Sequence, residues 1–206
     1  AKQINKELIK KGATDVIVTV NENSSNQIKF SNNLISTTES WYSSEINIFI
    51  AIKNKIAMTS IKEFNKKTIN ATIRNLIKLA KLSQPNKDYY CIAKGPFKYK
   101  KIENIYDKKV ISSDKVGIVE KAINLAKEQG AKRVSGLLEY SEASQHLISS
   151  SNAEAKEKGT NIHLSIRALA SKDASGHLTH TSRIFSRFNY KQAALEAGQI
   201  ANSSKK

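Results

Sequence analysis

The chain has 206 residues, with 34 lysines and arginines against 18 aspartates and glutamates, so its formal net charge is +16. This length allows one large domain or two small ones, and the regular apolar periodicity excludes disorder. A single cysteine, Cys91, excludes an intramolecular disulfide framework. No segment is apolar enough to span a bilayer, and the N-terminal residues do not resemble a signal peptide, so we expect a cytoplasmic protein without a membrane partner.

The positive charge is carried by 29 lysines and 5 arginines, in a chain that is also rich in isoleucine and asparagine. This joint bias is typical of an AT-rich coding genome, and lysine lacks the planar fork that reads bases. A solvated basic surface is therefore favoured over a nucleic-acid partner. One concentration of positive charge lies on a single predicted helix with no acidic residue among its members: Lys66, Lys67, Arg74, Lys78 and Lys81.

Hydrophobic periodicity predicts a mixed order of elements in the first half. In chain order these are a helix at 4–11, strands at 15–20, 27–30, 34–41, 45–53 and 56–61, and a helix that begins after residue 65. Gly12 ends the first helix, and Asn65 is expected to cap the second. Asn32 and Asn33 can adopt the positive φ of a tight hairpin, and Asn54 is expected to form the next turn.

Residues 83–113 have a different character. They contain both prolines and no hydrophobic period, so we expect a linker or extended arm. Five aromatic residues lie in this arm: Tyr89, Tyr90, Phe97, Tyr99 and Tyr106. We expect them to pack the arm against a neighbouring domain, although basic residues interleaved with aromatics are also typical of a surface that stacks single-stranded bases.

The second half repeats the order of the first. A helix that begins at Ser113 or Asp114 and ends at Gly130 precedes four strands, at 133–139, 146–150, 160–169 and 177–185. A last helix is expected to be capped by Asn189.

The two halves also match in sequence. LIKKGATDVIVTV corresponds to LAKEQGAKRVSGLLEY, with Gly12-Ala13 lying 118 positions before Gly130-Ala131. We therefore predict an α+β fold in which a helix–strand–hairpin–hairpin–helix unit is duplicated, giving two similar antiparallel-rich sheets, each covered by its flanking helices. The predicted domains are 1–82, a linker at 83–113, and 114–206.

Signals for catalysis are weak. The chain contains no His-Glu-x-x-His sequence, no glycine-rich phosphate loop and no Gly-x-Ser-x-Gly elbow. His177 and His180 are three apart on a strand, which places them on opposite faces, so they cannot share a metal ion. His146 and His163 are expected to be ordinary sheet residues, and Cys91 an inert thiol.

Four carboxylates, Asp15, Glu22, Glu39 and Glu45, could face one cleft, but their spacing favours solvated side chains. We accordingly predict no catalytic, cofactor-binding or metal-binding residue in this chain.

The run from LIKKGATDVIVTV to TIRNLIKLAKLS resembles the N-terminal domain of the TldD/PmbA family. The run from AINLAKEQGAKRVSGLLEY to NIHLSIRALAS resembles its middle domain, and YKQAALEAGQIA its closing helix. Two features depart from the family pattern. Residues 151–154 lack the Ser-x-Gly that follows the asparagine, and Ser44 and Asn54 stand where glycines are common.

The resemblance implies a zinc-dependent peptidase family, also labelled modulators of DNA gyrase. The family's His-Glu-x-x-x-His signature lies in a C-terminal domain, so we expect this chain to be a truncated, non-catalytic front portion. Zinc would be bound in that other domain of TldD-like members, whereas PmbA-like members lack the ligands.

By the same resemblance, this portion would serve dimerisation, as a homodimer or with a TldD/PmbA paralogue, and enclosure of a peptide substrate. Exposed strand edges could bind that peptide by strand addition. The alternative is a stand-alone basic α/β module that binds nucleic acid.

Overall fold

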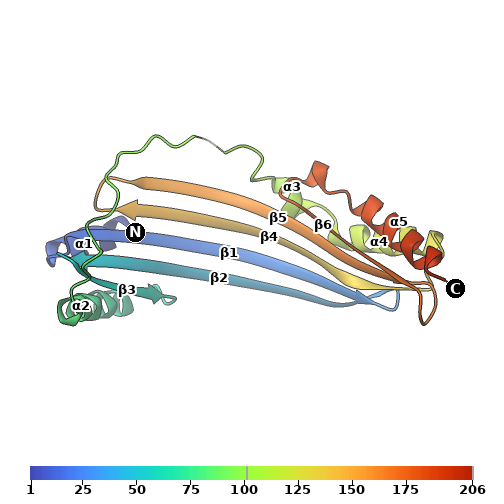
Figure 1. Cartoon of the computed structure of the whole chain (residues 1–206), viewed down its shortest axis with the longest axis horizontal. Helices are drawn as coiled ribbons and strands as arrows, with labels where there is room; N and C mark the ends of the chain where they lie inside the picture. Colours follow the sequence, from blue (N-terminus) through green and yellow to red (C-terminus); the bar gives the residue numbers. More distant parts are fainter. Residues whose placement is uncertain (101, 206) are drawn as a thin grey trace. The chain divides into compact units, whose positions relative to one another are not determined.

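The computed structural model describes residues 1–100 and 102–205. Lys101 of the expected linker and Lys206 of the expected second domain lie outside the described residues. Figure 1 shows the elements along the chain. In chain order they are α1 (Lys2–Lys10), β1 (Asp15–Ser31), β2 (Leu34–Ile52), β3 (Lys55–Ile61), α2 (Lys66–Leu82), α3 (Lys108–Ser112), α4 (Lys115–Glu128), β4 (Arg133–Ser149), β5 (Glu154–Leu169), β6 (Ser175–Ser182), a 3-10 turn (Phe185–Arg187) and α5 (Tyr190–Ser203).

The α+β class is confirmed, but the expectation of two separate sheets is wrong. One six-stranded sheet has the order β3-β2-β1-β4-β5-β6. Its two central strands are antiparallel, because Val16 bonds to Ser150 near one end while Asn33 bonds to Val134 near the other. This pairing satisfies the backbone groups that two separate sheets would leave exposed at inner edges.

The strands are longer than the apolar pattern predicted. The expected strands at 15–20 and 27–30 are both parts of β1, and those at 34–41 and 45–53 are both parts of β2. The intervening residues are polar and largely exposed or half-buried, so they show no alternation. In β1, backbone pairing to β2 and β4 holds these residues extended without a buried face, whereas the corresponding residues of β2 lie beyond the end of β3.

The chain forms two compact units. Unit 1 comprises Ala1–Asn23, Ser43–Lys101 and Ser144–Glu157, and unit 2 comprises Ser24–Tyr42, Ile102–Ala143 and Lys158–Lys206. Each unit draws on both halves of the sequence, because each of the four long strands contributes residues to both. The predicted ranges 1–82, 83–113 and 114–206 do not coincide with these units, and as boundaries of separate domains they remain a prediction.

The repeated order of elements is present, since α1-β1-β2-β3-α2 is followed by α4-β4-β5-β6-α5. The first helix of each repeat ends in the same way. Gly12 and Gly130 have φ of +95° and +97°, and the amides of Ala13 and Ala131 donate to carbonyls five residues earlier. These are Schellman motifs, which favour glycine because a side chain is strained at positive φ.

In unit 1, α1 and α2 pack on one face of the sheet. Asn65 caps α2 as predicted, its side chain accepting from the amide of Thr68 at 2.8 Å. The buried cluster contains Ile4 and Leu8 of α1, Ile73, Leu76, Ile77 and Ala80 of α2, Val16 and Val18 of β1, and Ile46, Ile48 and Ile50 of β2.

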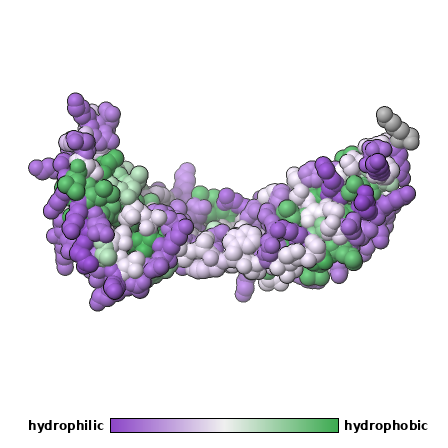
Figure 2. Space-filling view, turned by 90° about the horizontal axis from the view of Figure 1, so that it is seen from below, coloured by the Kyte–Doolittle hydropathy of each residue, from purple (hydrophilic) through white to green (hydrophobic). Residues whose placement is uncertain are grey.

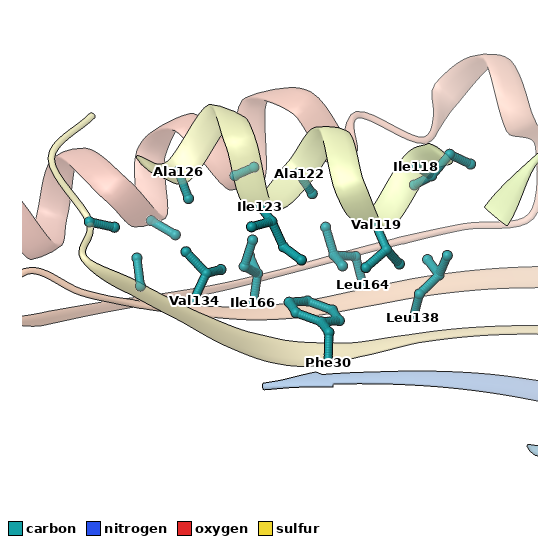
Figure 3. Close-up of a cluster of buried hydrophobic side chains, with 14 of the residues drawn as sticks. Phe30, Ile118, Val119, Ala122, Ile123, Ala126, Val134, Leu138, Leu164 and Ile166 are labelled. Carbon is teal, nitrogen blue, oxygen red and sulfur yellow. The ribbon is translucent and has the colours of Figure 1, made fainter. Parts of the chain in front are cut away.

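In unit 2, α4 and α5 cover the sheet, and the apolar side chains of α4 point toward the strands (Figure 3). The Phe30 ring lies under this helix and beside Gly136. A Cβ at position 136 would lie 2.6 Å from the Phe30 ring and closer still to the Ser165 carbonyl. Only glycine leaves room for this ring.

Two helix caps refine the predictions. Asp114, and not Ser113, caps α4 by accepting from Gly117 at 3.0 Å. Asn189 occupies the N-cap position of α5 but makes no capping hydrogen bond, so the expected role of its side chain is wrong.

The expected linker at 83–113 contains a short helix, α3, which the sequence did not predict because five residues are too few to show a period. Asp107 caps it, accepting from Lys109 at 2.9 Å. The same carboxylate accepts from the amide of Phe185 at 2.9 Å, and Val110 is fully buried. These two backbone donors, the Phe185 bond first, hold the pKa of Asp107 below its ordinary value.

Candidate functional site

The groups that could perform catalysis are dispersed. Among residues 1–100 and 102–205, no three histidine, cysteine, aspartate or glutamate side chains are placed to hold a metal ion. His177 lies 3.0 Å from Ser165, whereas the ring of His180 packs 5.7 Å from that of Phe188. The two histidines thus lie on opposite faces, as their spacing predicted.

The other two histidines have partners within the sheet. His163 lies 2.7 Å from the Thr181 hydroxyl, and His146 lies 3.0 Å from Glu154. Cys91 is an exposed thiol.

The acidic residues also have separate partners. Asp15 accepts from the Tyr89 hydroxyl at 2.8 Å, and Glu39 pairs with Lys29 at 3.2 Å. Glu22 accepts from Ser144 at 3.2 Å. These carboxylates do not form an acidic cluster.

The most perturbed lysine is one that the sequence did not single out. Lys115 is 6% exposed, and its ammonium donates to the carbonyls of Ile111 and Ser113 at 2.9 and 2.8 Å. It also lies 4.3 Å from the centre of the Tyr140 ring. Burial lowers the pKa of Lys115 to about 8. Because these contacts tie the end of α3 to α4, we assign the side chain a structural role.

The segment 86–95, which we call the strap, crosses the face of unit 1 that carries no helix. Asn86 donates to the Asn54 carbonyl at 2.8 Å where the strap begins. The Tyr89 ring packs 5.8 Å from that of Phe49, next to its bond with Asp15. Burial first, and then this bond to a carboxylate, raise the pKa of Tyr89.

At its other end the strap joins the turn between β4 and β5. The amide of Gly95 donates to the Ser151 carbonyl at 2.7 Å, and the Ser151 hydroxyl donates to the Ala93 carbonyl. A Cβ at position 95 would lie 2.7 Å from the Asn152 carbonyl oxygen, so the backbones touch here. The strap is therefore fastened at both sides of the sheet.

The aromatic residues of the arm divide into two groups. Tyr89 packs on the sheet, as expected for an arm held against its neighbour. Tyr90, Phe97, Tyr99 and Tyr106 are 89%, 43%, 57% and 39% exposed, and the ring centroids of Phe97 and Tyr99 are 6.1 Å apart.

Beside Tyr89, the helix-free face of unit 1 has a shallow depression of about 440 Å³. Most of its lining lies on the opposite face of the strands from the buried core, namely Ile17, Thr19, Asn47, Phe49, Met58 and Ser60, and Ile48 and Thr59 complete it. Met58 is 70% exposed and lies directly opposite Phe49 in the β2–β3 register. Most of the surface exposed in this depression is apolar.

The depression reaches the edge of the sheet, because β3 is its outermost strand on this side. Ile52 and Lys55 flank a two-residue turn, and the two residues of such a pair donate a backbone hydrogen bond to each other. Every second pair along the hairpin does the same, starting with Ile50 and Ala57. The amides and carbonyls of Ile56, Met58 and Ser60 accordingly face away from β2. They form an open edge next to the apolar depression.

The basic helix α2 lies on the other face of the same strands. Its buried residues contact Ile48 and Ile50, whereas the strap contacts Phe49. The two parts of the alternative nucleic-acid surface, the basic helix and the aromatic arm, therefore face opposite sides of unit 1.

This architecture defines a duplicated α+β fold. Solved structures share it, among them three that are each 15% identical in sequence to this chain. A candidate modulator of DNA gyrase from Bacteroides thetaiotaomicron VPI-5482 matches 98% of this chain with a TM-score of 0.83. TldE from Thermococcus kodakarensis matches 96% with a TM-score of 0.80, and a candidate gyrase modulator from Thermotoga maritima MSB8 matches 98% with a TM-score of 0.78.

These likenesses confirm, at the level of the fold, the resemblance to the TldD/PmbA family. The chain spans about half the length of the solved chains, covering 48%, 46% and 46% of them in the order above. No protein-family model and no curated protein sequence matches it. In the described part of the chain, no helix is long and apolar enough to cross a membrane.

Proposed function

We propose that this chain is a non-catalytic portion of a TldD/PmbA-like metallopeptidase, with the hydrolytic zinc site elsewhere in the assembly. The observation that supports this most is a fold match, TldE included, that covers nearly all of this chain and under half of each solved chain. The described residues do not fit a zinc site, since no suitable group of ligands is present among them. We assign no step of hydrolysis to them.

The role proposed for this portion is to hold an extended peptide. The open backbone edge of β3 can pair with a peptide strand, and alternate peptide side chains can then reach Phe49 and Met58 in the depression. Backbone pairing is independent of sequence, which suits an enzyme that acts on unfolded chains.

Binding to this surface can be tested with a fluorescein-labelled pool of random decapeptides and the 206-residue chain. We expect saturable binding in the micromolar range, weakened at least tenfold by Met58→Lys, because a charge at an edge opposes strand addition. Leu34→Lys is the matched control, since Leu34 is 72% exposed and lies in unit 2. Equal loss in both variants, or no binding at 1 mM peptide, would contradict the proposal.

The absence of catalysis is a separate expectation. The purified chain should cleave no peptide of the same pool, with or without added zinc, as followed by mass spectrometry. Zinc-dependent cleavage by this chain would overturn the assignment of the metal site to another part.

Dimerisation is proposed from the family resemblance. Sedimentation equilibrium should show either a homodimer or association with a TldD/PmbA paralogue. A monomer in both experiments would contradict this part of the proposal.

A further inference from the structure

The two repeats place equivalent helix pairs on the sheet, but only one pair is strongly basic. The helices α1 and α2 contain eight basic residues and one acidic residue, Glu7. The helices α4 and α5 contain four basic and three acidic residues. Because both pairs occupy the same place in the repeat, the fold itself does not require the charge.

This difference in charge also bears on whether codon bias explains the many lysines of the chain. A genome-wide preference for lysine codons would enrich both helix pairs alike. It leaves unexplained why acidic residues are nearly absent from α1 and α2 while they balance the lysines of α4 and α5.

Four of the basic residues form a single row along α2. At 3.6 residues per turn, Lys67, Arg74, Lys78 and Lys81 fall within an arc of about 60°, and the row is about 21 Å long. All four side chains are exposed, on a side of the helix next to the stripe of buried residues. In Figure 2, purple hydrophilic residues cover much of the part on the left that carries these helices, around smaller green patches.

The row is not neutralised within unit 1. Of the eight basic residues of α1 and α2, only Lys2 forms an ion pair among the described residues, with Glu154 at 3.0 Å. Arg74 and Asn70 of α2 line a hollow of about 210 Å³ together with Glu7 and Lys11. Lys55 adds another cation beside the row, since it donates to the Lys81 carbonyl at 2.9 Å.

We propose that this basic row, with the adjacent end of α1, binds the phosphate backbone of nucleic acid without reading its sequence. The proposal goes beyond the peptide-binding role and uses the opposite face of unit 1. Lysine suits phosphate as a point charge, and four of the five basic residues of α2 are lysines.

The dimensions of the row match this ligand. A duplex presents a phosphate on each strand every ~3.4 Å along its axis, so a row about 21 Å long spans about six base-pair steps, of which only those phosphates that face the row as the strand winds can be contacted. Folded acidic proteins seldom offer such a density of negative charge in a line. We therefore favour nucleic acid over an acidic protein or an anionic membrane.

The test uses the 206-residue chain and a fluorescein-labelled 20-base-pair duplex, with anisotropy measured from 50 to 200 mM salt. Four phosphate contacts predict a slope of log K against log salt of about −3.6, so the affinity should fall about 150-fold over this range. The variant Lys67→Gln/Arg74→Gln/Lys78→Gln/Lys81→Gln should lose this dependence. The double variant Arg74→Gln/Lys78→Gln should lose about half of it.

A matched control removes the same charge from unit 2, where Lys121, Lys127, Arg133 and Lys191 are exposed. Replacing these four by glutamine should leave the salt slope within about one of the wild-type value. Circular dichroism melting of each variant checks that it folds. If the quadruple variant does not fold, the salt dependence of the double variant alone decides the test.

Four results would overturn the proposal: no salt-dependent binding of the duplex, equal losses in the two quadruple variants, equal binding to polyglutamate, or equal binding to vesicles of anionic lipid. None of them bears on the peptide site, because the Met58→Lys comparison is made on the opposite face. The two proposals can therefore fail independently.

Discussion

Replacing the buried Lys115 by methionine should change the pH dependence of stability in a defined way. Burial lowers the pKa of Lys115 from 10.5 to about 8. Between these values the unfolded chain holds a proton that the folded chain has released, so the free energy of unfolding rises with pH. The stabilisation is complete above pH 10.5 and is lost as the pH falls through about 8.

The size of the effect follows from the shift. Each pH unit between the two pKa values contributes about 1.4 kcal/mol, so the full rise is on the order of 3 kcal/mol, most of it reached by pH 10. Methionine has a similar length and no titratable group, so Lys115→Met should lack this rise. The substitution also removes the hydrogen-bond donor to two carbonyls. This loss lowers the free energy of unfolding of the variant by the same amount at all pH values.

The assay is urea unfolding followed by circular dichroism at 222 nm, at one-unit steps from pH 7 to pH 10. Subtracting the variant from the wild type cancels the contributions of the other titratable groups, which both proteins share. Lys121→Met, an exposed lysine on the same helix, is the control and should follow the wild type. Parallel curves for the wild type and Lys115→Met would refute the reasoning.

Three further predictions concern the fold. Gly12→Ala and Gly130→Ala should each lower the free energy of unfolding by about 1 kcal/mol in urea titrations, because both positions have positive φ; no change at either would contradict the Schellman assignment. Gly136→Ala should cost at least about 2 kcal/mol, because a Cβ there clashes first with the Ser165 carbonyl and then with the Phe30 ring, and Phe30→Leu in the same chain should recover only the part due to the ring. Asp107→Asn should flatten the loss of stability on acidification below pH 4, since the low pKa of this carboxyl stabilises the fold only while it is ionised; an unchanged acid transition would argue against its capping role.

The elements with a strong apolar period could be predicted from the sequence. The stripe of α2 and its cap Asn65 are confirmed, as is the positive φ of Asn32 and Asn33 in the first hairpin. Local chemistry decides these features, because caps and tight turns depend on a few neighbouring residues.

Features that depend on distant pairing could not be predicted. The polar middle of β1 has no alternation, since it is held by β2 and β4 and not by a buried face. The joining of two repeats into one sheet likewise depends on the edges of β1 and β4, which carry no distinct sequence signal. Lys115 donates to local carbonyls, those of Ile111 and Ser113, but it also packs on the Tyr140 ring, 25 positions away, and its burial could not be predicted from the sequence.

The candidate surfaces show the same limit. The sequence marked Phe49 and Met58 only as residues of two strands, and their pairing beside an open edge follows from the register. The basic row of α2 was visible in the sequence. Its significance emerged only when the structure supplied the equivalent but balanced pair, α4 and α5.

The comparison of the two repeats suggests why the candidate surfaces fall in unit 1. In unit 2, Gly198 lets α5 approach α4 so closely that a Cβ there would lie 2.6 Å from the Ala126 carbonyl oxygen. Between α1 and α2 the structure instead leaves hollows of about 380 and 210 Å³. Tight packing favours stability, whereas an open helix pair with unpaired charge leaves surface for a ligand. The two helix pairs therefore differ in packing as well as in charge, since α4 and α5 are in close contact whereas α1 and α2 leave hollows beside the basic row.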